Sequence, residues 1–203
     1  MDIKVRLALT EEMLGTCPAD PELYEKYIVG KLEKNGQTPV PEATEEEIES
    51  LPDVADMVEK GTTVFHRLED GPCVFDYVIK GFLKGAMEAL RRVKKTDVPA
   101  AYKKVIDQTI FVMPRQIPIV LPEGGEMGFC ERPLRADTAQ GPRVSLARSE
   151  TVPVGSTLEF TVTLLQESVA ECVEQCWDYG KYLGIGQWRT SGKGRFTYEI
   201  LDA

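Results

Sequence analysis

The chain has 203 residues, of which 42% are hydrophobic and 28% are charged, and this composition excludes a chain that is disordered throughout. Its formal net charge of −9 argues against a nucleic-acid partner unless the acidity is local. No apolar run of signal-peptide or membrane length occurs near the N-terminus, so we expect a cytoplasmic protein with no membrane partner.

The acidity lies in the first part of the chain. Residues 1–60 carry 15 acids and 6 bases, whereas residues 61–203 carry 18 of each. Eight of the carboxylates fall between Glu42 and Glu59. The rest of the chain gathers its cations in short clusters, which can form a basic face on a molecule that is acidic in total.

Alternating hydrophobic residues predict a half-buried first strand at residues 2–9. Residues 10–60 then have the character of a long helical insertion, with a short helix at 21–29 and an acidic helix at 44–60. Thr44 followed by Glu47 fits a capping box at the start of the second helix. We therefore expect an acidic insertion directly after the first strand.

The next elements are an apolar strand that runs into a helix, within residues 73–93, and a second core strand within residues 107–121. The helix places Phe82, Leu83, Met87 and Leu90 on its inner side. Pro114 and Pro118 interrupt the second strand, as expected of an edge or bulged strand. The stretch PEGGE, residues 122–126, predicts a hairpin turn.

The last third of the chain predicts a strand at 156–165, a helix at 167–184 and a final strand at 195–201. Leaving out the insertions, the order is strand, helix, strand, strand, helix, strand. This order predicts an α+β, ferredoxin-like βαββαβ core, which is also the architecture of RNA-recognition domains. We expect one domain over residues 1–203, with insertions at 10–60 and at 114–151, the second resembling a thumb before the third core strand.

Between the last helix and the last strand lies GIGQWRTSGKGRF, residues 184–196. Its glycine spacing fits neither a dinucleotide fingerprint nor a P-loop. What remains is a glycine pair, five residues and a second glycine pair, with one tryptophan and three cations between and beside them. Glycine lets a backbone approach a ligand and leaves amides open, cations bind phosphate, and an indole can stack on a base. The alternative is a flexible turn into the last strand.

Three passages resemble the RAMP (repeat-associated mysterious protein) superfamily, in particular the backbone subunits of CRISPR effector complexes. The glycine loop resembles the loop that this family places before its last strand. The passage YVIKGFLKGAMEALRR looks like the family's first-helix motif. The segment that ends in Glu150, Val152, Pro153, Gly155 and Phe160 is similar to the one before the family's third core strand. Together these passages cover residues 75–198.

The resemblance implies a subunit that binds single-stranded RNA or DNA and stacks along it as a homo-oligomer or beside other RAMP subunits. Target-cleaving relatives carry an Asp ahead of the first helix motif, where this chain has Gly61, Thr62 and Thr63. We therefore expect no cleavage by that mechanism. The acidic insertion has no counterpart in such a subunit, and it could cover a nucleic-acid groove, bind a basic partner or mimic nucleic acid.

The residues expected to contact nucleic acid share a basic, glycine or aromatic character and lie on the first helix, in the thumb-like region and in the glycine loop. For the helix cations, solvated charge and helix termination are the alternatives. The set comprises Lys80, Gly81, Lys84, Arg91, Arg92, Lys95, Arg135, Arg143, Gly184, Gly186, Trp188, Arg189, Gly192, Lys193, Gly194 and Arg195.

We expect no catalytic residue, metal or cofactor. His66 is the only histidine, and we expect it to be a loop residue or a nucleic-acid contact. Cys172 and Cys176 lie one helical turn apart without a second ligand pair nearby, so a reduced core pair is expected. The five scattered cysteines favour reduced thiols over a disulfide framework.

Three hypotheses remain open from the sequence. The first is a non-catalytic, RAMP-like protein that binds single-stranded nucleic acid. The second is a regulatory protein, for example a phage-encoded relative, that keeps this fold and binds a protein partner through its acidic insertion. The third is an endoribonuclease that uses His66.

Overall fold

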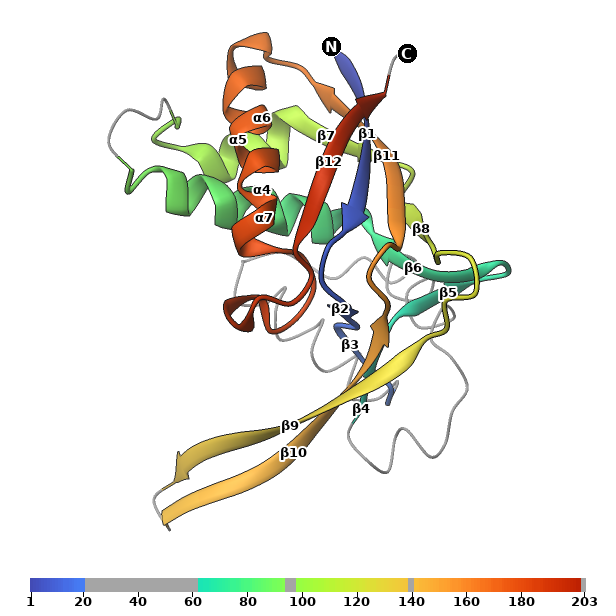
Figure 1. Ribbon diagram of the computed structural model, residues 1–203. Helices are drawn as coiled ribbons and strands as arrows, with labels where there is room; N and C mark the ends of the chain where they lie inside the picture. The colour runs from blue at the N-terminus through green and yellow to red at the C-terminus, as the bar shows by residue number, and fades with distance from the viewer. Residues whose placement is uncertain (21–61, 94–97, 139–140, 202–203) are drawn as a thin grey trace.

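The computed structural model describes residues 1–20, 62–93, 98–138 and 141–201, with the backbone alone for 134–138 and 141–145 (Figure 1). The helices predicted at 21–29 and 44–60 lie outside the described residues, as does Lys95. The fold is α+β, as predicted, with two mainly antiparallel sheets and a small set of helices. No helix among the described residues is long and apolar enough to cross a membrane.

Four strands form the centre of the larger sheet, in the spatial order β12 (Phe196–Leu201), β1 (Asp2–Leu9), β11 (Thr157–Leu164) and β7 (Ile110–Met113). Each neighbouring pair is antiparallel. Along the chain, α4 (Asp76–Leu90) lies between β1 and β7, and α6 (Ala170–Asp178) lies between β11 and β12. These elements follow one another along the chain as strand, helix, strand, strand, helix and strand. The sheet continues beyond it through β8 (Gln116–Val120), β6 (Gly71–Phe75) and β5 (His66–Leu68).

The core lies between this sheet and the helices. Val5 and Leu7 of β1 are fully buried and stand opposite Phe160 and Leu158 of β11. From the helices, the ring of Trp177 stacks on Phe82 with centroids 5.7 Å apart. The alternation that predicted the strands therefore marks the face that packs on the helices, because successive strand residues point to opposite faces.

The interruption of the second strand is confirmed at Pro114, since β7 and β8 pair with the same edge of β11 on either side of it. The interruption expected at Pro118 is wrong, because Pro118 lies within β8 and stands opposite Cys73 of β6. Ahead of β7 lies α5 (Tyr102–Thr109), which the sequence did not predict. It buries Tyr102 and Ile106, four residues apart. Two inward positions are too few to show a helical period in the sequence.

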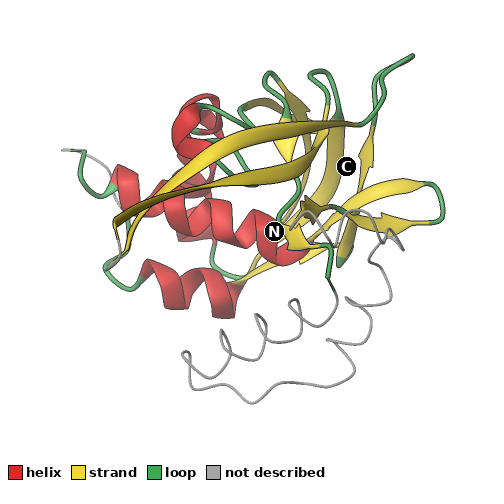
Figure 2. Ribbon diagram, turned by 90° about the horizontal axis from the view of Figure 1, so that it is seen from below, coloured by secondary structure: helices red, strands yellow, loops and turns green. Residues whose placement is uncertain are grey.

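The smaller sheet contains β2 (Met13–Leu14), β3 (Cys17–Pro18), β4 (Thr62–Val64), β9 (Gly128–Thr138) and β10 (Gly141–Val152). Strands β9 and β10 form a long hairpin that reaches away from the body of the molecule (Figure 1). From below, it crosses in front of the helices as a separate two-stranded ribbon (Figure 2). Its base is held by β2 and β4, which pair with β10.

The expected hairpin at residues 122–126 is wrong, although the turn itself is present. The Gly125 amide donates to the Pro122 carbonyl at 2.8 Å. However, β8 before this turn belongs to the larger sheet and β9 after it to the smaller one. The turn therefore joins two sheets, because β8 pairs with β6 and β11 and not with β9. The projecting ribbon starts only at Gly128.

Candidate nucleic-acid interface

The glycine loop is folded onto itself. Gly184, Gly186, Gly192 and Gly194 all have positive φ, between 69° and 86°, which residues with a Cβ rarely adopt. The Ile185 amide donates to the Gly194 carbonyl at 2.8 Å, and a Cβ on Gly194 would overlap the carbonyl oxygen of Ile185. The two glycine pairs thus pack against each other, and the close backbone approach that their spacing predicts occurs within the loop.

The expectation of open glycine amides is wrong for three of the four glycines. The amide of Gly184 donates to Gly180, that of Gly192 to Arg189 and that of Gly194 to Glu12, in each case to the backbone carbonyl. These hydrogen bonds satisfy backbone amides that would otherwise have no acceptor in the tight turns. The amides of these three glycines are therefore not free to bind a ligand.

Two of the predicted loop cations are engaged in the fold. Lys193 forms an ion pair with Glu12, and this hydrogen-bonded carboxylate raises the pKa of Lys193. The guanidinium of Arg195 lies beneath Gly192, where its Cζ is 3.1 Å from the position of a Cβ. Its Nε is buried without a hydrogen-bond partner among the described residues. Lys193 thus holds the loop against the N-terminal segment, and the Arg195 side chain packs within the loop.

Trp188 stands at the tip of the loop in a left-handed conformation, with φ 54° and ψ 34°. It is the one non-glycine residue with positive φ in the part of the chain that the structure describes. Its side chain remains partly open to solvent, with 39% of the residue exposed. The guanidinium carbon of Arg132, on β9, lies 5.1 Å from the centre of the indole.

A buried polar network holds Arg132 in place. Its Nη2 donates to Gln187 Oε1 at 2.8 Å and its Nη1 to Ser149 Oγ at 3.1 Å. Ser149 also accepts a hydrogen bond from Thr63 Oγ1 at 2.8 Å. The network joins β4, both strands of the hairpin and the glycine loop, so it fixes the loop against the hairpin base.

The sequence did not single out Arg132, because only the register places it. Arg132 stands opposite Ala147 and two residues from Cys130, which pairs with Ser149, so Arg132 and Ser149 share one face of the ribbon. The predicted Arg135 and Arg143 lie further along the same hairpin, where the structure describes the backbone alone.

The loop also reaches α4 through Arg189. A Cβ on Gly85 would stand 3.5 Å from Arg189 Nη1 and 3.4 Å from Leu183 Cδ2. Gly81, one turn earlier, is open, since no described atom lies within 4 Å of its Cβ position. The first-helix motif and the glycine loop, about 100 residues apart in sequence, therefore form one surface.

The other predicted cations on α4 and just after it also contact neighbouring groups. Lys84 forms an ion pair with Asp107 at 2.5 Å, and Lys80 Nζ lies 5.2 Å from the centre of the Phe111 ring. Arg91 donates to the Ala100 carbonyl at 3.4 Å, and Arg92 pairs with Glu88 at 3.4 Å. Exposed pairs of this kind are weak. Lys80 and Lys84 are half-buried, whereas Arg91 and Arg92 are exposed.

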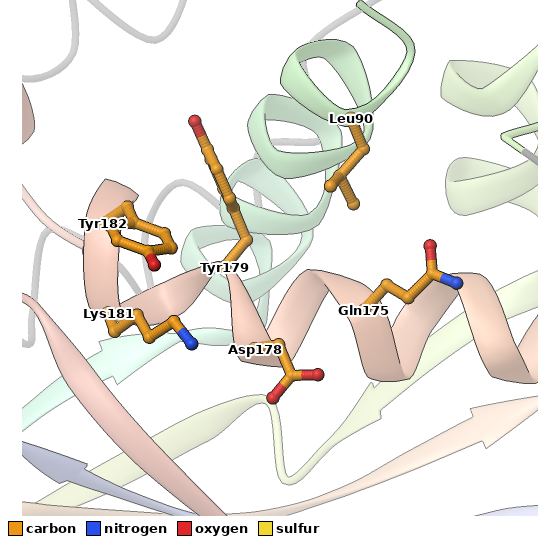
Figure 3. A pocket seen from close by; sticks show the side chains of 6 residues that line it. All are labelled: Leu90, Gln175, Asp178, Tyr179, Lys181 and Tyr182. Atoms are coloured by element: carbon orange, nitrogen blue, oxygen red, sulfur yellow. The ribbon is translucent and has the colours of Figure 1, made fainter. Parts of the chain in front are cut away.

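A shallow pocket of about 230 Å³ lies between the end of α4 and the pair α6 and α7 (Gly180–Leu183) (Figure 3). Its lining combines aromatic, polar and charged side chains. Lys181 Nζ lies 5.2 Å from the centre of the Tyr182 ring, and Tyr182 is 60% exposed. The lining residues are Leu90, Gln175, Asp178, Tyr179, Lys181 and Tyr182.

His66 was expected to be a loop residue or a nucleic-acid contact, but it lies buried in strand β5. It is 2% exposed, its Nε2 lies 2.6 Å from Cys17 Sγ, and its ring meets Phe75 edge to face. An acid or base that acts on RNA must reach the reacting hydroxyl. The site therefore gives no support to the endoribonuclease hypothesis.

Glu150 and the cysteines, which the sequence also singled out, make contacts within the fold. The Glu150 carboxylate accepts the Phe65 amide at 3.0 Å and pairs with Arg67, so it ties β10 to the chain around β5. Cys172 and Cys176 are both buried, and their hydrogen bond together with burial raises the pKa of Cys176. None of the five cysteines forms a disulfide. Within the described ranges, no group of three His, Cys, Asp or Glu residues is placed to hold a metal ion.

No protein-family model matches the chain, and no curated protein matches its sequence. Among solved structures, a chain of a Type IV-B CRISPR complex is similar over 100% of this chain and 91% of its own, at 11% identity and a TM-score of 0.49. A chain of the Type III-B Cmr-beta complex bound to cognate target RNA is similar over 99% of this chain and 58% of its own, at 11% identity and a TM-score of 0.47. Both of these chains belong to CRISPR complexes.

Proposed function

We propose that the protein is a non-catalytic, RAMP-like subunit that binds single-stranded RNA or DNA. The binding surface, called here the loop surface, consists of Trp188 and Arg189 of the glycine loop and of Gly81 and Gly85 on α4, and Arg132 at the hairpin base supports the indole of Trp188. The observation that carries the proposal is the exposed Trp188 in a left-handed conformation beside the guanidinium of Arg132.

Backbone strain supports a functional role for Trp188. A left-handed conformation costs a residue with a side chain about 1–2 kcal/mol, and a bulky aromatic gains nothing from it locally. Asn or Gly would relieve this cost if the loop needed only its shape. An aromatic ring that is held strained and 39% exposed is suited to contact with a partner.

The local charge supports an anionic partner. Arg189 lies over Gly85, and the open Gly81 leaves room beside it for a phosphate backbone. Arg91 and Arg92 continue the positive charge to the end of α4 with only weak, exposed partners. Sequence-independent binding of single strands uses this combination of cations and aromatic rings.

The proposal is tested by binding of fluorescently labelled 20-nucleotide single-stranded RNA and DNA to the purified chain. We expect Arg189→Ala to weaken binding about fivefold or more at low salt, with a shallower dependence on salt concentration. The matched control is Lys4→Ala, which removes a half-exposed cation from the larger sheet. The Nζ of Lys4 lies 3.8 Å from the Glu159 carboxylate. The control should change affinity less than twofold. Equal affinity of the wild type and Arg189→Ala, or no binding of either strand, would overturn the proposal.

A further inference from the structure

One part of the loop surface has the geometry of a stacking site rather than of a phosphate site. The guanidinium of Arg132 lies over the indole of Trp188 at 5.1 Å, so a cation already occupies one side of the ring. Trp188 itself is 39% exposed to solvent. A partly exposed ring that carries a cation on one side can receive a second flat group.

The supporting cation is unavailable to phosphate. Arg132 is 8% exposed, and its two terminal nitrogens donate to Ser149 and Gln187. Arg132 therefore serves to position the indole. Because Gln187 is the residue before Trp188, the same hydrogen bonds also hold the backbone that carries the ring.

The neighbouring glycines fix the loop further. Gly186 packs so tightly that its Cβ position is 2.8 Å from the Leu14 carbonyl oxygen, and Gly192 has φ +86°. The indole is thus fixed in its orientation before any ligand binds. Preorganisation of this kind lowers the entropy cost of binding a flat ligand.

We propose that Trp188 stacks on one unpaired base of the bound strand and that Arg132 is its positioning residue. The inference rests on the proposed function and adds that the loop contacts the face of a base as well as the charged backbone of the strand. Bases in a duplex are stacked on both sides and cannot present a free face without unstacking. Any of the bases fits, because each has a π-face. The site therefore selects single strands over duplexes without selecting a sequence.

The test compares three probes of the same length: 20-nucleotide oligo(dT), a fully abasic strand with the same phosphates, and a duplex. For the wild type we expect oligo(dT) to bind about tenfold more tightly than the abasic strand. Trp188→Asn should remove this difference, and Trp188→Phe should keep most of it. Asn is the chosen replacement because it tolerates the left-handed conformation.

Two further readouts separate stacking from structure. Binding of oligo(dT) should quench the fluorescence of Trp188, while Trp177, which is 2% exposed in the core, provides a constant background. Arg132→Gln should reduce the preference for oligo(dT) over the abasic strand while binding of the abasic strand is kept. Loss of affinity for both probes together would show that Arg132 acts only on folding and would contradict its positioning role.

The failures of the two proposals are distinguishable. Equal binding of oligo(dT) and the abasic strand by the wild type, unchanged in Trp188→Asn, overturns the stacking inference and leaves the proposed function standing. No binding of any probe overturns the proposed function itself.

Discussion

The glycine loop and helix α4 use the same residue type in opposite ways. In the loop, each glycine has positive φ, and for three of them a Cβ would stand less than 3 Å from backbone atoms, as for Gly186 beside Leu14. On α4, Gly81 has open space around it, and Gly85 has only ordinary contacts with two side chains. The loop glycines therefore build the fold, while the helix glycines leave its surface open.

This difference shows where a glycine motif leaves room for a ligand to bind. A glycine that is packed against its own chain has no room for a partner, however much its spacing resembles a binding loop. At the loop, the side chains of Trp188 and Arg189 are left to contact a partner. At α4, the open helix surface itself remains available.

The largest expected effect is that of Gly194→Ala. The new Cβ would overlap the Ile185 carbonyl oxygen at a φ of +69°, so we expect the free energy of unfolding to fall by about 3 kcal/mol or more. Urea denaturation measures it. The matched control is Gly124→Ala, which has φ +71° but no described atom within 4 Å of its Cβ position. Gly124→Ala should cost about 1–2 kcal/mol, from backbone strain alone. Equal costs at the two positions would show that close packing does not set the loop glycines apart.

An effect of opposite sign is expected for Gly81→Ala. A helix-interior alanine is about 0.5–1 kcal/mol more favourable than glycine, and at this position nothing obstructs the methyl group. We expect the midpoint of urea unfolding to rise. A lower midpoint would mean that the open space around Gly81 is filled in the folded protein, and the contrast with the loop would then be lost.

The smallest effect is expected for Lys193→Met, which breaks the ion pair with Glu12. The pair is partly exposed, so the loss in unfolding free energy should be about 1 kcal/mol or less at neutral pH. The pKa of Lys193 is raised above its ordinary value of 10.5, so the folded state binds the proton more tightly than the unfolded state. The stabilisation is complete below pH 10.5 and is lost as the pH rises through the raised pKa. The stability difference between the wild type and Lys193→Met should therefore shrink in alkaline buffer, and a difference that persists there would contradict the role of the charge.

The elements that the sequence predicted correctly share a visible period. Leu158, Phe160, Val162 and Leu164 alternate along β11 and are all buried, as are Phe82, Leu83 and Met87 on α4. An element that buries one face must repeat its hydrophobic residues with the period of a strand or a helix, so this spacing can be recognised in the sequence alone. The second sheet lacks such a signal, because β2, β3 and β4 contain two or three residues each.

The candidate site was predicted in part. The sequence pointed to Trp188 and Arg189 through the unusual composition of their loop, and the structure places Arg189 beside Gly85 of α4. It could not distinguish Arg189 from Lys193, since the partner Glu12 is 181 residues away. It also missed Arg132, whose position depends on the register of a hairpin whose start was expected too early.

By itself, the sequence determined the α+β class, the order of the core elements and the presence of a glycine loop rich in cations. These features are local, because strand and helix periods and turn glycines act over a few residues. Only the tertiary structure decided which cations are engaged in the fold, which glycine amides are paired and which residues support Trp188. Those properties depend on contacts between segments that are distant in sequence, such as the pairing of Lys193 with Glu12 and of Gln187 with Arg132. Such contacts form only when the two sheets and α4 come together around the loop.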